Sequence, residues 1–400
     1  MDIRPIFVSL YKHLTPALLI VMEIALSYAV LCNALFMING RVAAMHVQNA
    51  IGESAISVIT MQGLDAAQLR ADIPRNLVAL QGIAGVSAAA VTTSVPLDGQ
   101  VAMMAFTARP AEKNSVNSSE YFLGEGGEKA LGLRLLQGRF FNESEYASSG
   151  RQDFLSTGHV VLITQSDAQR LWPGESPLGK LLYSDSSNWT VVGVVADVLG
   201  QDPAVSGENG RYSSAFFPLQ TDDALNDYVI YSAPAERARI VREALRVIGK
   251  LEPTAIIDGK PYEEIRSDYF ATSRSMVWIL ALVCAVMLAV NAFGVIGLTS
   301  FWVAQRYRQI GIRRAVGASR RHIFMYFQTE NLLLSGMGAV LGMTLAYGIN
   351  IYLMHHYEVE RMPWYYLLLG MIALLLLGQL AVLGPTLRAS LIPPLAAMRR

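Results

Sequence analysis

The chain has 400 residues, of which 52% are hydrophobic and only 16% are charged. Soluble domains usually carry about a quarter charged residues, so this composition argues against an ordinary soluble protein. The formal net charge is zero, but residues 41–273 hold 27 Asp and Glu against 19 Lys and Arg, which leaves a basic excess on the rest of the chain.

Four long apolar segments predict transmembrane helices. Each is longer than the roughly 20 residues that a helix needs to cross about 30 Å of hydrocarbon. Core helices of soluble proteins are normally shorter and keep one polar face. The first segment is too long for a cleaved signal peptide, so we expect it to remain as an anchor. The predicted spans are residues 14–39, 274–305, 323–354 and 363–388.

The basic residues predict the orientation of these spans. They gather in the N-terminal lead 1–13, in the loop 306–322, which holds six arginines, and around the tail 389–400. Lys and Arg mark the cytoplasmic side of short loops. We therefore expect both termini in the cytoplasm. The large segment 40–273 and the short hairpin 355–362 are expected on the opposite side.

The large outer segment has two β-α-β patterns. The first has a strand, a helix and a strand at residues 55–61, 65–81 and 86–95, with Asp65 as the helix N-cap. The second has the same order, followed by a short helix, at residues 228–232, 235–251, 254–258 and 262–267. Two such units predict a ferredoxin-like split β-α-β subdomain.

Residues 99–221 lie between the two units and predict an inserted, mainly-β subdomain. This segment is rich in Ser, Asn, Gly and Asp, and its clearest strands are residues 160–164 and 190–195. Residues 197–211 predict a loop. The overall fold class is therefore an integral membrane α-helical protein with four transmembrane helices and a large α+β outer domain.

Signatures of enzymes are incomplete in this chain. Residues 174–180 match most of a phosphate-binding loop, but Leu181 replaces the Ser or Thr that binds Mg²⁺. No histidine or cysteine spacing resembles a zinc site, and no G-x-S-x-G elbow occurs. We expect no catalytic, cofactor or metal site here, so that any ATP and Mg²⁺ would bind to another chain.

The arginine-rich loop predicts a short basic helix along the membrane surface. Ile310, Arg313, Arg314 and Gly317 recur at helical spacing. Gly317 suits a helix C-terminus, and Ser319 suits the start of the next helix. Two functions remain open for this helix. It either sets the topology by contact with anionic lipid, or it is a coupling helix that inserts into a groove on a cytosolic ATPase.

Several motifs resemble a known family. Residues 303–318, Val-Ala-Gln-Arg-Tyr-Arg-Gln-Ile-Gly-Ile-Arg-Arg-Ala-Val-Gly-Ala, resemble the signature of MacB/FtsX-type (type VII, mechanotransmission) ABC transporter permeases. Residues 131–141 and 168–180 resemble two motifs of the MacB-like periplasmic core domain. One departure is Gln309, where the family usually has Glu. Another is the tail, which follows the family pattern only loosely and makes an unequal second permease plausible.

The resemblance implies a permease subunit of the bacterial inner membrane that works as a dimer with a second copy or a paralogue. ATP and Mg²⁺ would bind to a separate cytosolic ABC ATPase, whose movement is relayed to the periplasmic domain. Partners would also include lipid, a periplasmic adaptor and an outer-membrane channel, with no nucleic acid. The ATPase-coupling residues implied are Gln305, Arg306, Arg308, Gln309, Ile310, Gly311, Ile312, Arg313, Arg314 and Gly317.

The sequence leaves three functions open, which differ in the molecule that the permease acts on. The large periplasmic domain favours efflux or secretion of a peptide, toxin or antibiotic. The alternatives are FtsX-like signalling that activates a periplasmic partner, and lipoprotein extraction of the Lol type. A stand-alone membrane-anchored binding protein would leave the coupling motif unexplained.

Three polar residues inside the spans are candidate sites, because such groups are costly in lipid. Glu23 is either a functional contact across the bundle or a gate, or a carboxyl on a water-filled or protein-packed face that aids helix association. Glu330 is expected to pair with the basic loop. Asn291, followed by Gly294 and Gly297, predicts close helix packing or a dimer contact.

Overall fold

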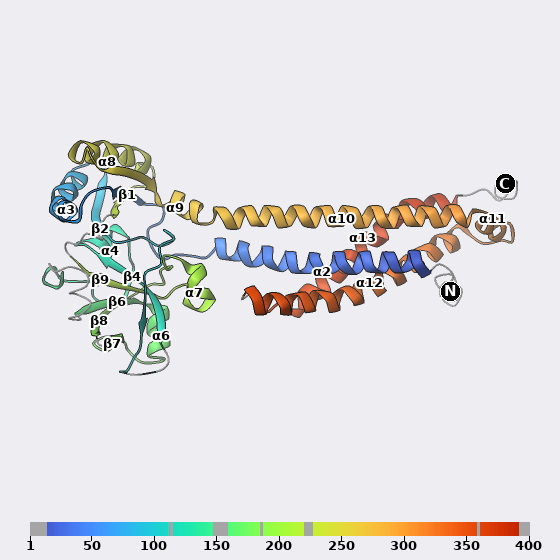
Figure 1. Cartoon of the computed structure of the whole chain (residues 1–400), viewed down its shortest axis with the longest axis horizontal. Helices are drawn as coiled ribbons and strands as arrows, with labels where there is room; N and C mark the ends of the chain where they lie inside the picture. Colours follow the sequence, from blue (N-terminus) through green and yellow to red (C-terminus); the bar gives the residue numbers. More distant parts are fainter. Residues whose placement is uncertain are drawn as a thin grey trace. The chain divides into compact units, whose positions relative to one another are not determined.

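The computed structural model describes residues 14–110, 112, 115–146, 159–184, 187–219, 227–357 and 361–391. The chain divides into two compact units (Figure 1). The helical unit comprises Met1–His46 and Ser273–Arg400, and the α/β unit comprises Val47–Thr272.

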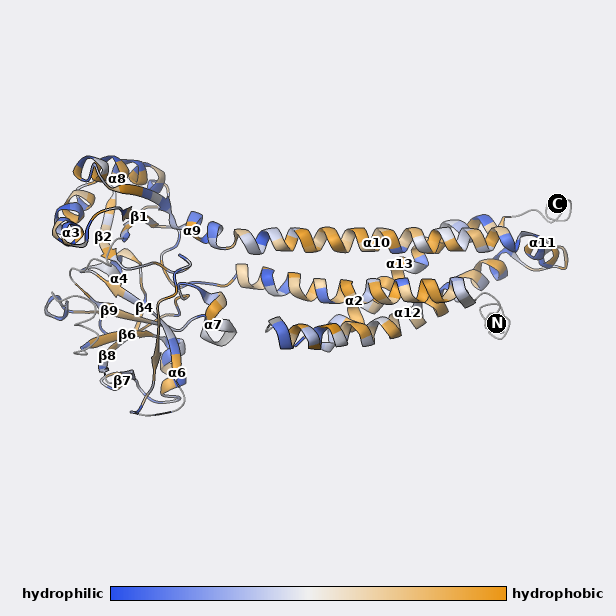
Figure 2. Ribbon diagram, in the orientation of Figure 1, coloured by the Kyte–Doolittle hydropathy of each residue, from blue (hydrophilic) through white to orange (hydrophobic). Residues whose placement is uncertain are grey.

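Four long helices build the helical unit, and all are long and apolar enough to cross a membrane. Figure 2 shows apolar residues along most of their length. They are α2 (Leu14–Met45), α10 (Ala271–Gln305), α12 (Arg320–Tyr357) and α13 (Trp364–Ser390), with the short α11 (Tyr307–Ala315) between α10 and α12.

Several helix ends differ from the predicted spans. Helix α2 continues past residue 39 to Met45, and α12 already begins at Arg320. The predicted hairpin 355–362 is partly helical, because α12 continues through His355 and His356 to Tyr357. The predicted lead 1–13 and most of the tail 389–400 lie outside the described residues.

Small residues of α12 allow α2 to pack closely against it. A Cβ added to Gly342 would lie 2.7 Å from Tyr28 Cβ and 2.8 Å from Ala25 O. At Gly338 it would lie 2.7 Å from Ile24 Cγ2. Asn33 of α2 donates from Nδ2 to Ala346 O of α12 at 3.1 Å. The two backbones are therefore in near contact along this face, as glycine-mediated helix pairs in membranes are.

The ferredoxin-like part of the α/β unit is confirmed. Its elements are β1 (Ile56–Gln62), α3 (Ala66–Gln81), β2 (Val86–Thr92), β10 (Asp227–Ser232), α8 (Arg237–Leu251) and β11 (Ile256–Pro261). The strands pair antiparallel in the order β11-β1-β10-β2. Helices α3 and α8 pack on one face through a core that includes Ile59, Leu80, Ile240 and Ile248. Asp65 caps α3 by accepting from Gln68 N at 2.8 Å, as predicted.

The segment between the two halves extends the same sheet. It adds β3 (Met103–Phe106), β4 (Val116–Leu123), α4 (Gly127–Ala130), β5 (Leu135–Gly138), the 3₁₀ turn η1 (Glu143–Glu145), β6 (Val160–Thr164), α6 (Gln165–Leu171), β7 (Leu181–Ser184), β8 (Ser187–Val195), α7 (Pro203–Gly210) and β9 (Ser214–Pro218). The sheet continues in the order β2-β4-β9-β6-β8-β5. The pair Thr92 and Leu123 joins β2 to β4.

One prediction in this segment is wrong. Residues 197–211 were expected to form a loop, but they contain α7 (Pro203–Gly210). Asp202 accepts from Ala204 N at the start of α7, and Pro203 occupies the first turn, where its missing N–H costs nothing. The short helix α9 (Tyr262–Tyr269) then ends the unit.

Candidate functional site

Helix α11 has the ends that the sequence predicts. Gly317 adopts a positive φ of 102°, and Ala318 N donates to Arg313 O at 2.9 Å, which is the hydrogen bond of a Schellman C-terminus. Ser319 Oγ accepts from His322 N at 3.2 Å and so caps the start of α12. The arginine-rich segment is therefore a fixed helix with a defined turn on its C-terminal side.

The two faces of α11 have different environments. Ile310 is only 5% exposed and packs with Ile323 and Phe327 of α12 and with Ala389 of α13. Gly311 is buried as well. Ile310 therefore holds α11 against the bundle, and the predicted contact of Ile310 and Gly311 with a partner stays a prediction.

The outward face of α11 is basic with an apolar pair. Ile312 is 47% exposed and Val316, four residues later, is 84% exposed. Residues four apart lie on the same side of a helix. Of the other predicted coupling residues, Gln305, Arg308 and Gln309 are exposed, and so is Arg313, whose guanidinium lies 5.4 Å from the centre of the Tyr326 ring. Arg314 lies on α11, but its side chain is outside what the structure describes.

A buried ion pair joins the start of α11 to α12. Arg306 Nη1 donates to Glu330 Oε2 at 3.1 Å and to Oε1 at 3.2 Å. The side chains are 11% and 2% exposed. The Arg306 guanidinium also lies 5.6 Å from the centre of the Trp302 ring. The expected pairing of Glu330 with the basic loop is therefore present, and Arg306 is turned into the bundle.

The other polar residues in the spans pack between helices. The carboxylate of Glu23 fills the space beside Gly294, where an added Cβ would lie 2.5 Å from Oε1. Asn291 is 3% exposed, and its Oδ1 has no hydrogen-bond partner in the described part of the chain. Nothing lies within 4 Å of a Cβ added to Gly297. Of the two glycines, Gly294 alone provides a close approach here.

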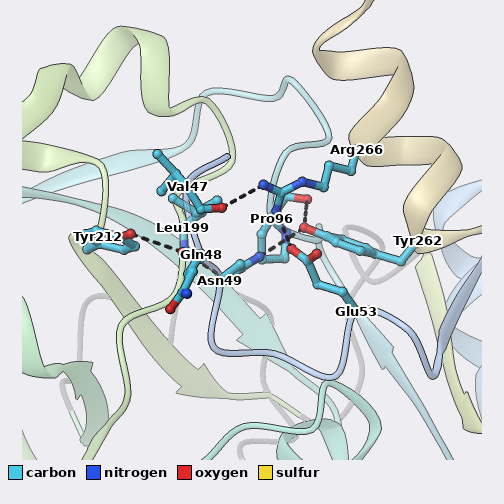
Figure 3. A network of polar contacts seen from close by, with 9 residues as sticks. All are labelled: Val47, Gln48, Asn49, Glu53, Pro96, Leu199, Tyr212, Tyr262 and Arg266. Atoms are coloured by element: carbon cyan, nitrogen blue, oxygen red, sulfur yellow. Dashed lines mark hydrogen bonds and ion pairs between the residues drawn. The ribbon is translucent and has the colours of Figure 1, made fainter. Parts of the chain in front are cut away.

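A second site, within the α/β unit, was not apparent from the sequence. Its members lie on the segment that follows α2, on α9, and on the three loops that follow β2, β8 and α7 (Figure 3). We call it the junction network, and it consists of Val47, Gln48, Asn49, Glu53, Pro96, Leu199, Tyr212, Tyr262 and Arg266.

Arg266 and Tyr262 organise the junction network. The Arg266 guanidinium donates to Glu53 Oε1 and to Val47 O, each at 2.6 Å. Tyr262 OH accepts from Asn49 Nδ2 at 3.2 Å and donates to Pro96 O at 2.9 Å. Because residue 47 follows α2 and α9 precedes α10 in the chain, the network ties together the two points where the chain enters and leaves the α/β unit.

Replacing Arg266 with methionine should destabilise the α/β unit by about 2 kcal/mol, because a half-buried charged donor makes two hydrogen bonds that the thioether cannot replace. The apparent thermal midpoint of the purified protein should fall by roughly 5 °C. Arg139→Met is the matched control. The Arg139 side chain is 45% exposed and paired with Glu145, so this change should shift the midpoint little. Equal shifts for the two variants would contradict a special role for Arg266.

Comparison with known proteins identifies the family. A family model described as the MacB-like periplasmic core domain matches residues 19–255, and one described as the FtsX-like permease C-terminal matches residues 281–394. The chain belongs to the MacB/FtsX family of ABC transporter permeases. The resemblance of residues 303–318 to MacB/FtsX permeases is thereby confirmed, and it marks the chain as a membrane protein of this family.

Individual MacB/FtsX relatives are distant. The macrolide export ATP-binding/permease protein MacB of Chromobacterium violaceum is 28% identical over 244 residues, which cover 59% of this chain and 36% of that protein. The uncharacterized ABC transporter permease YknZ of Bacillus subtilis is 23% identical, covering 80% of this chain and 77% of that one. The crystal structure of the periplasmic region of MacB from Actinobacillus actinomycetemcomitans aligns with 55% of this chain and 94% of its own, at 15% identity and a TM-score of 0.37. The chain thus matches only about a third of the length of the MacB relative.

Proposed function

We propose that this chain is the membrane subunit of an ABC exporter, in which the outward face of α11 docks on a separate cytosolic ATPase. The observation that carries the proposal is the exposed pair Ile312 and Val316 on a basic helix. The opposite side of that helix is fixed to the bundle by Ile310. An apolar pair surrounded by arginines suits a groove on a protein better than a purely aqueous surface.

A movement of α11 has a physical route to the α/β unit. Helix α11 directly follows α10, and Ile310 N donates to Arg306 O across their junction. Helix α10 is joined to the α/β unit through α9, and α2 is joined to it through residue 47. The junction network holds together the points where the chain enters and leaves the α/β unit. A shift of α2 relative to α10 would therefore pull on this network and exert a force on the α/β unit. In this proposal α11 lies in the cytoplasm and the α/β unit lies on the outer side of the inner membrane, as the basic residues of the short loops predict.

The proposed client is a peptide, toxin or antibiotic. Support comes from the size of the α/β unit and from the MacB relative, whose name assigns macrolide export and joins ATP-binding and permease functions in one protein. In this proposal a partner binds ATP, because Leu181 stands where a phosphate-binding loop needs the Ser or Thr that binds Mg²⁺.

Loss of the ATPase from the Ile312→Asp/Val316→Asp variant is the expected result that tests this proposal. Two carboxylates on the docking face should lower the affinity for the ATPase at least about ten-fold. The reason is that charges buried in an interface without a partner of opposite sign disfavour binding. The measurement is co-purification in detergent with a candidate ABC ATPase, scored as the molar ratio of the two proteins after size exclusion.

Val78→Asp is the matched control, because Val78 is 71% exposed on α3 of the α/β unit. It should retain the ATPase like the wild type. The proposal fails if the wild type never retains an ATPase, or if the double variant retains it in the same ratio as Val78→Asp. Ile310→Asp is not informative here, because a buried carboxylate would disturb the bundle itself.

A further inference from the structure

The α/β unit has a cavity of about 370 Å³ that the proposed transport function does not use. It lies on the face of the ferredoxin-like sheet opposite to α3 and α8. Strands β1, β10 and β11 form its floor, and the turn at residues 95–99 and helix α9 form its walls. All of these elements belong to the α/β unit.

The strand register directs charged side chains into this cavity. Thr60 of β1 is paired with Asp227 of β10 on one side and with Asp258 of β11 on the other. Val58 is paired with Lys260. Cross-strand partners point to the same face of a sheet, and so do residues two apart on one strand. Asp227, Asp258 and Lys260 therefore project to the cavity side.

The cavity wall has more negative than positive charge. Asp98 and Asp268 add to the two strand carboxylates, so four aspartates face one lysine. Lys260 Nζ lies 3.1 Å from Asp268 Oδ2 and 3.7 Å from Asp258 Oδ2, so it is engaged with these two carboxylates. Among the described residues that line the cavity, no second basic side chain faces Asp98 and Asp227.

Asp227 is the most unusual member of this group. It is only 5% exposed, and its Oδ1 has no hydrogen-bond partner in the described part of the chain. A buried carboxylate oxygen without a donor is costly and therefore rare in proteins. The Asp227 side chain lines the cavity, so a positive group bound there would offset the cost of burying its charge.

Asp98 is held in place by its own turn. Its Oδ1 accepts from Gln100 N at 2.9 Å and its Oδ2 from Val95 N at 3.2 Å. The preceding Leu97 is buried and has a φ of 65°, a conformation that costs about 1 kcal/mol or more for a side chain of this kind. The packing around Leu97 thus fixes the carboxylate at the cavity rather than in solvent.

Burial raises the pKa values of both carboxylates toward neutral pH. Burial, with a contribution from the negative charge of Asp227, raises the pKa of Asp98 to about 7. Burial also raises the pKa of Asp227 to about 6, against a hydrogen bond from Thr60 that lowers it. A bound cation would favour the ionised form of both groups and reverse these shifts.

We propose that this cavity is a binding site for a small organic cation, whose ammonium or amidinium group donates to Asp227 and Asp98. Such a group supplies several N–H donors and the positive charge that the lining lacks. A metal ion fits less well, because the described residues contain no cluster of three or more His, Cys, Asp or Glu placed to hold one. The site is independent of whether α11 binds an ATPase.

The test uses benzamidine as the probe and benzamide as its neutral analogue of the same shape, added to the full-length protein in detergent. Ligand-observed NMR titration should give benzamidine an affinity at least about ten-fold higher than benzamide. Asp227→Asn should remove that advantage and leave benzamide unchanged. The matched control is Glu264→Gln, an exposed carboxylate of α9 that does not line the cavity.

The pH dependence gives a second readout that needs no variant. Six titratable groups face the cavity: Asp98 from the turn, Asp227 from β10, Asp258 and Lys260 from β11, and Asp268 and Tyr269 from α9. Benzamidine affinity should fall from about pH 8 to about pH 5, because Asp98 and Asp227 take up protons in that range, while benzamide affinity stays constant. If Asp227→Asn does not fold, Asp98→Asn replaces it.

Three outcomes would overturn the proposal. The first is equal binding of benzamidine and benzamide. The second is an advantage of benzamidine that survives both Asp227→Asn and Asp98→Asn. The third is displacement of benzamidine by millimolar Ca²⁺ at constant ionic strength, which would assign the cavity to a metal ion instead. None of these outcomes bears on the α11 docking experiment, so the two proposals fail separately.

Discussion

Replacing Gly342 with leucine is expected to abolish the packing of α2 against α12. A Cβ at this position would lie 2.8 Å from Ala25 O and 2.7 Å from Tyr28 Cβ. The first of these atoms is backbone, so it cannot move without shifting the whole of α2. Ala25 and Tyr28 are themselves fully buried, which leaves no space into which the side chains can relax. Overpacking of this kind costs about 3 kcal/mol or more when the backbone is the obstacle.

The same helix provides matched controls. Nothing lies within 4 Å of a Cβ added to Gly336 or to Gly348. Gly336→Leu and Gly348→Leu should therefore retain a monodisperse protein, and they gain about 1 kcal/mol of helix propensity. The measurement is the thermal midpoint and the monodisperse fraction in detergent for the three variants. Similar losses in all three would show that α12 tolerates no leucine anywhere and would refute the specific contact at Gly342.

The spans and the β-α-β units were predictable because their signals are local. A run of apolar residues or an N-cap such as Asp65 is readable within one segment, and the structure has a helix or strand wherever these signals were strong. The Gly338 and Gly342 pair was readable too, as a G-x-x-x-G motif in an apolar helix. The close packing predicted from Asn291, Gly294 and Gly297 is present at Gly294 but not at Gly297.

Helix α7 was missed because its composition opposes helix formation. It contains Gly207, which breaks the helical conformation with a φ of 66°, and it ends with Gly210. The start signal was nevertheless present, since Asp202 followed by Pro203 is a common N-cap and first-turn pair. The capping pair was thus a better guide here than the propensity of the residues that follow.

The orientation of α11 and the junction network depended on distant residues. Ile310 and Ile312 are equally apolar, and the burial of Ile310 is decided by Ile323 and Phe327 on the next helix. Arg266 and Glu53 are 213 positions apart in the sequence. Neither contact has a local pattern, so a single sequence predicts the helices at these sites but not which of their side chains meet.

Breaking the ion pair between Arg306 and Glu330 is expected to have the second large effect. Glu330→Gln would leave the Arg306 guanidinium buried without a carboxylate, and removing one partner of a buried pair typically costs about 3–5 kcal/mol. Glu175→Gln is the control, because Glu175 is paired with Lys180 in an exposed position, where the change should have no measurable effect. The measurement is again the thermal midpoint in detergent.

The double variant Arg306→Met/Glu330→Leu separates two explanations for such a loss. In the first explanation, the loss of stability in Glu330→Gln is caused by the buried Arg306 guanidinium that no longer faces a carboxylate. In that case removing both charges should restore most of the thermal midpoint, because apolar residues of similar volume often replace a buried pair without loss of stability. If the pair also positions α11, the double variant should recover the midpoint but still retain less ATPase than the wild type. Recovery of both the thermal midpoint and the ATPase binding would show that the ion pair contributes only through packing. Recovery of neither would mean that the hydrogen-bond geometry at the start of α11 is itself required for the fold.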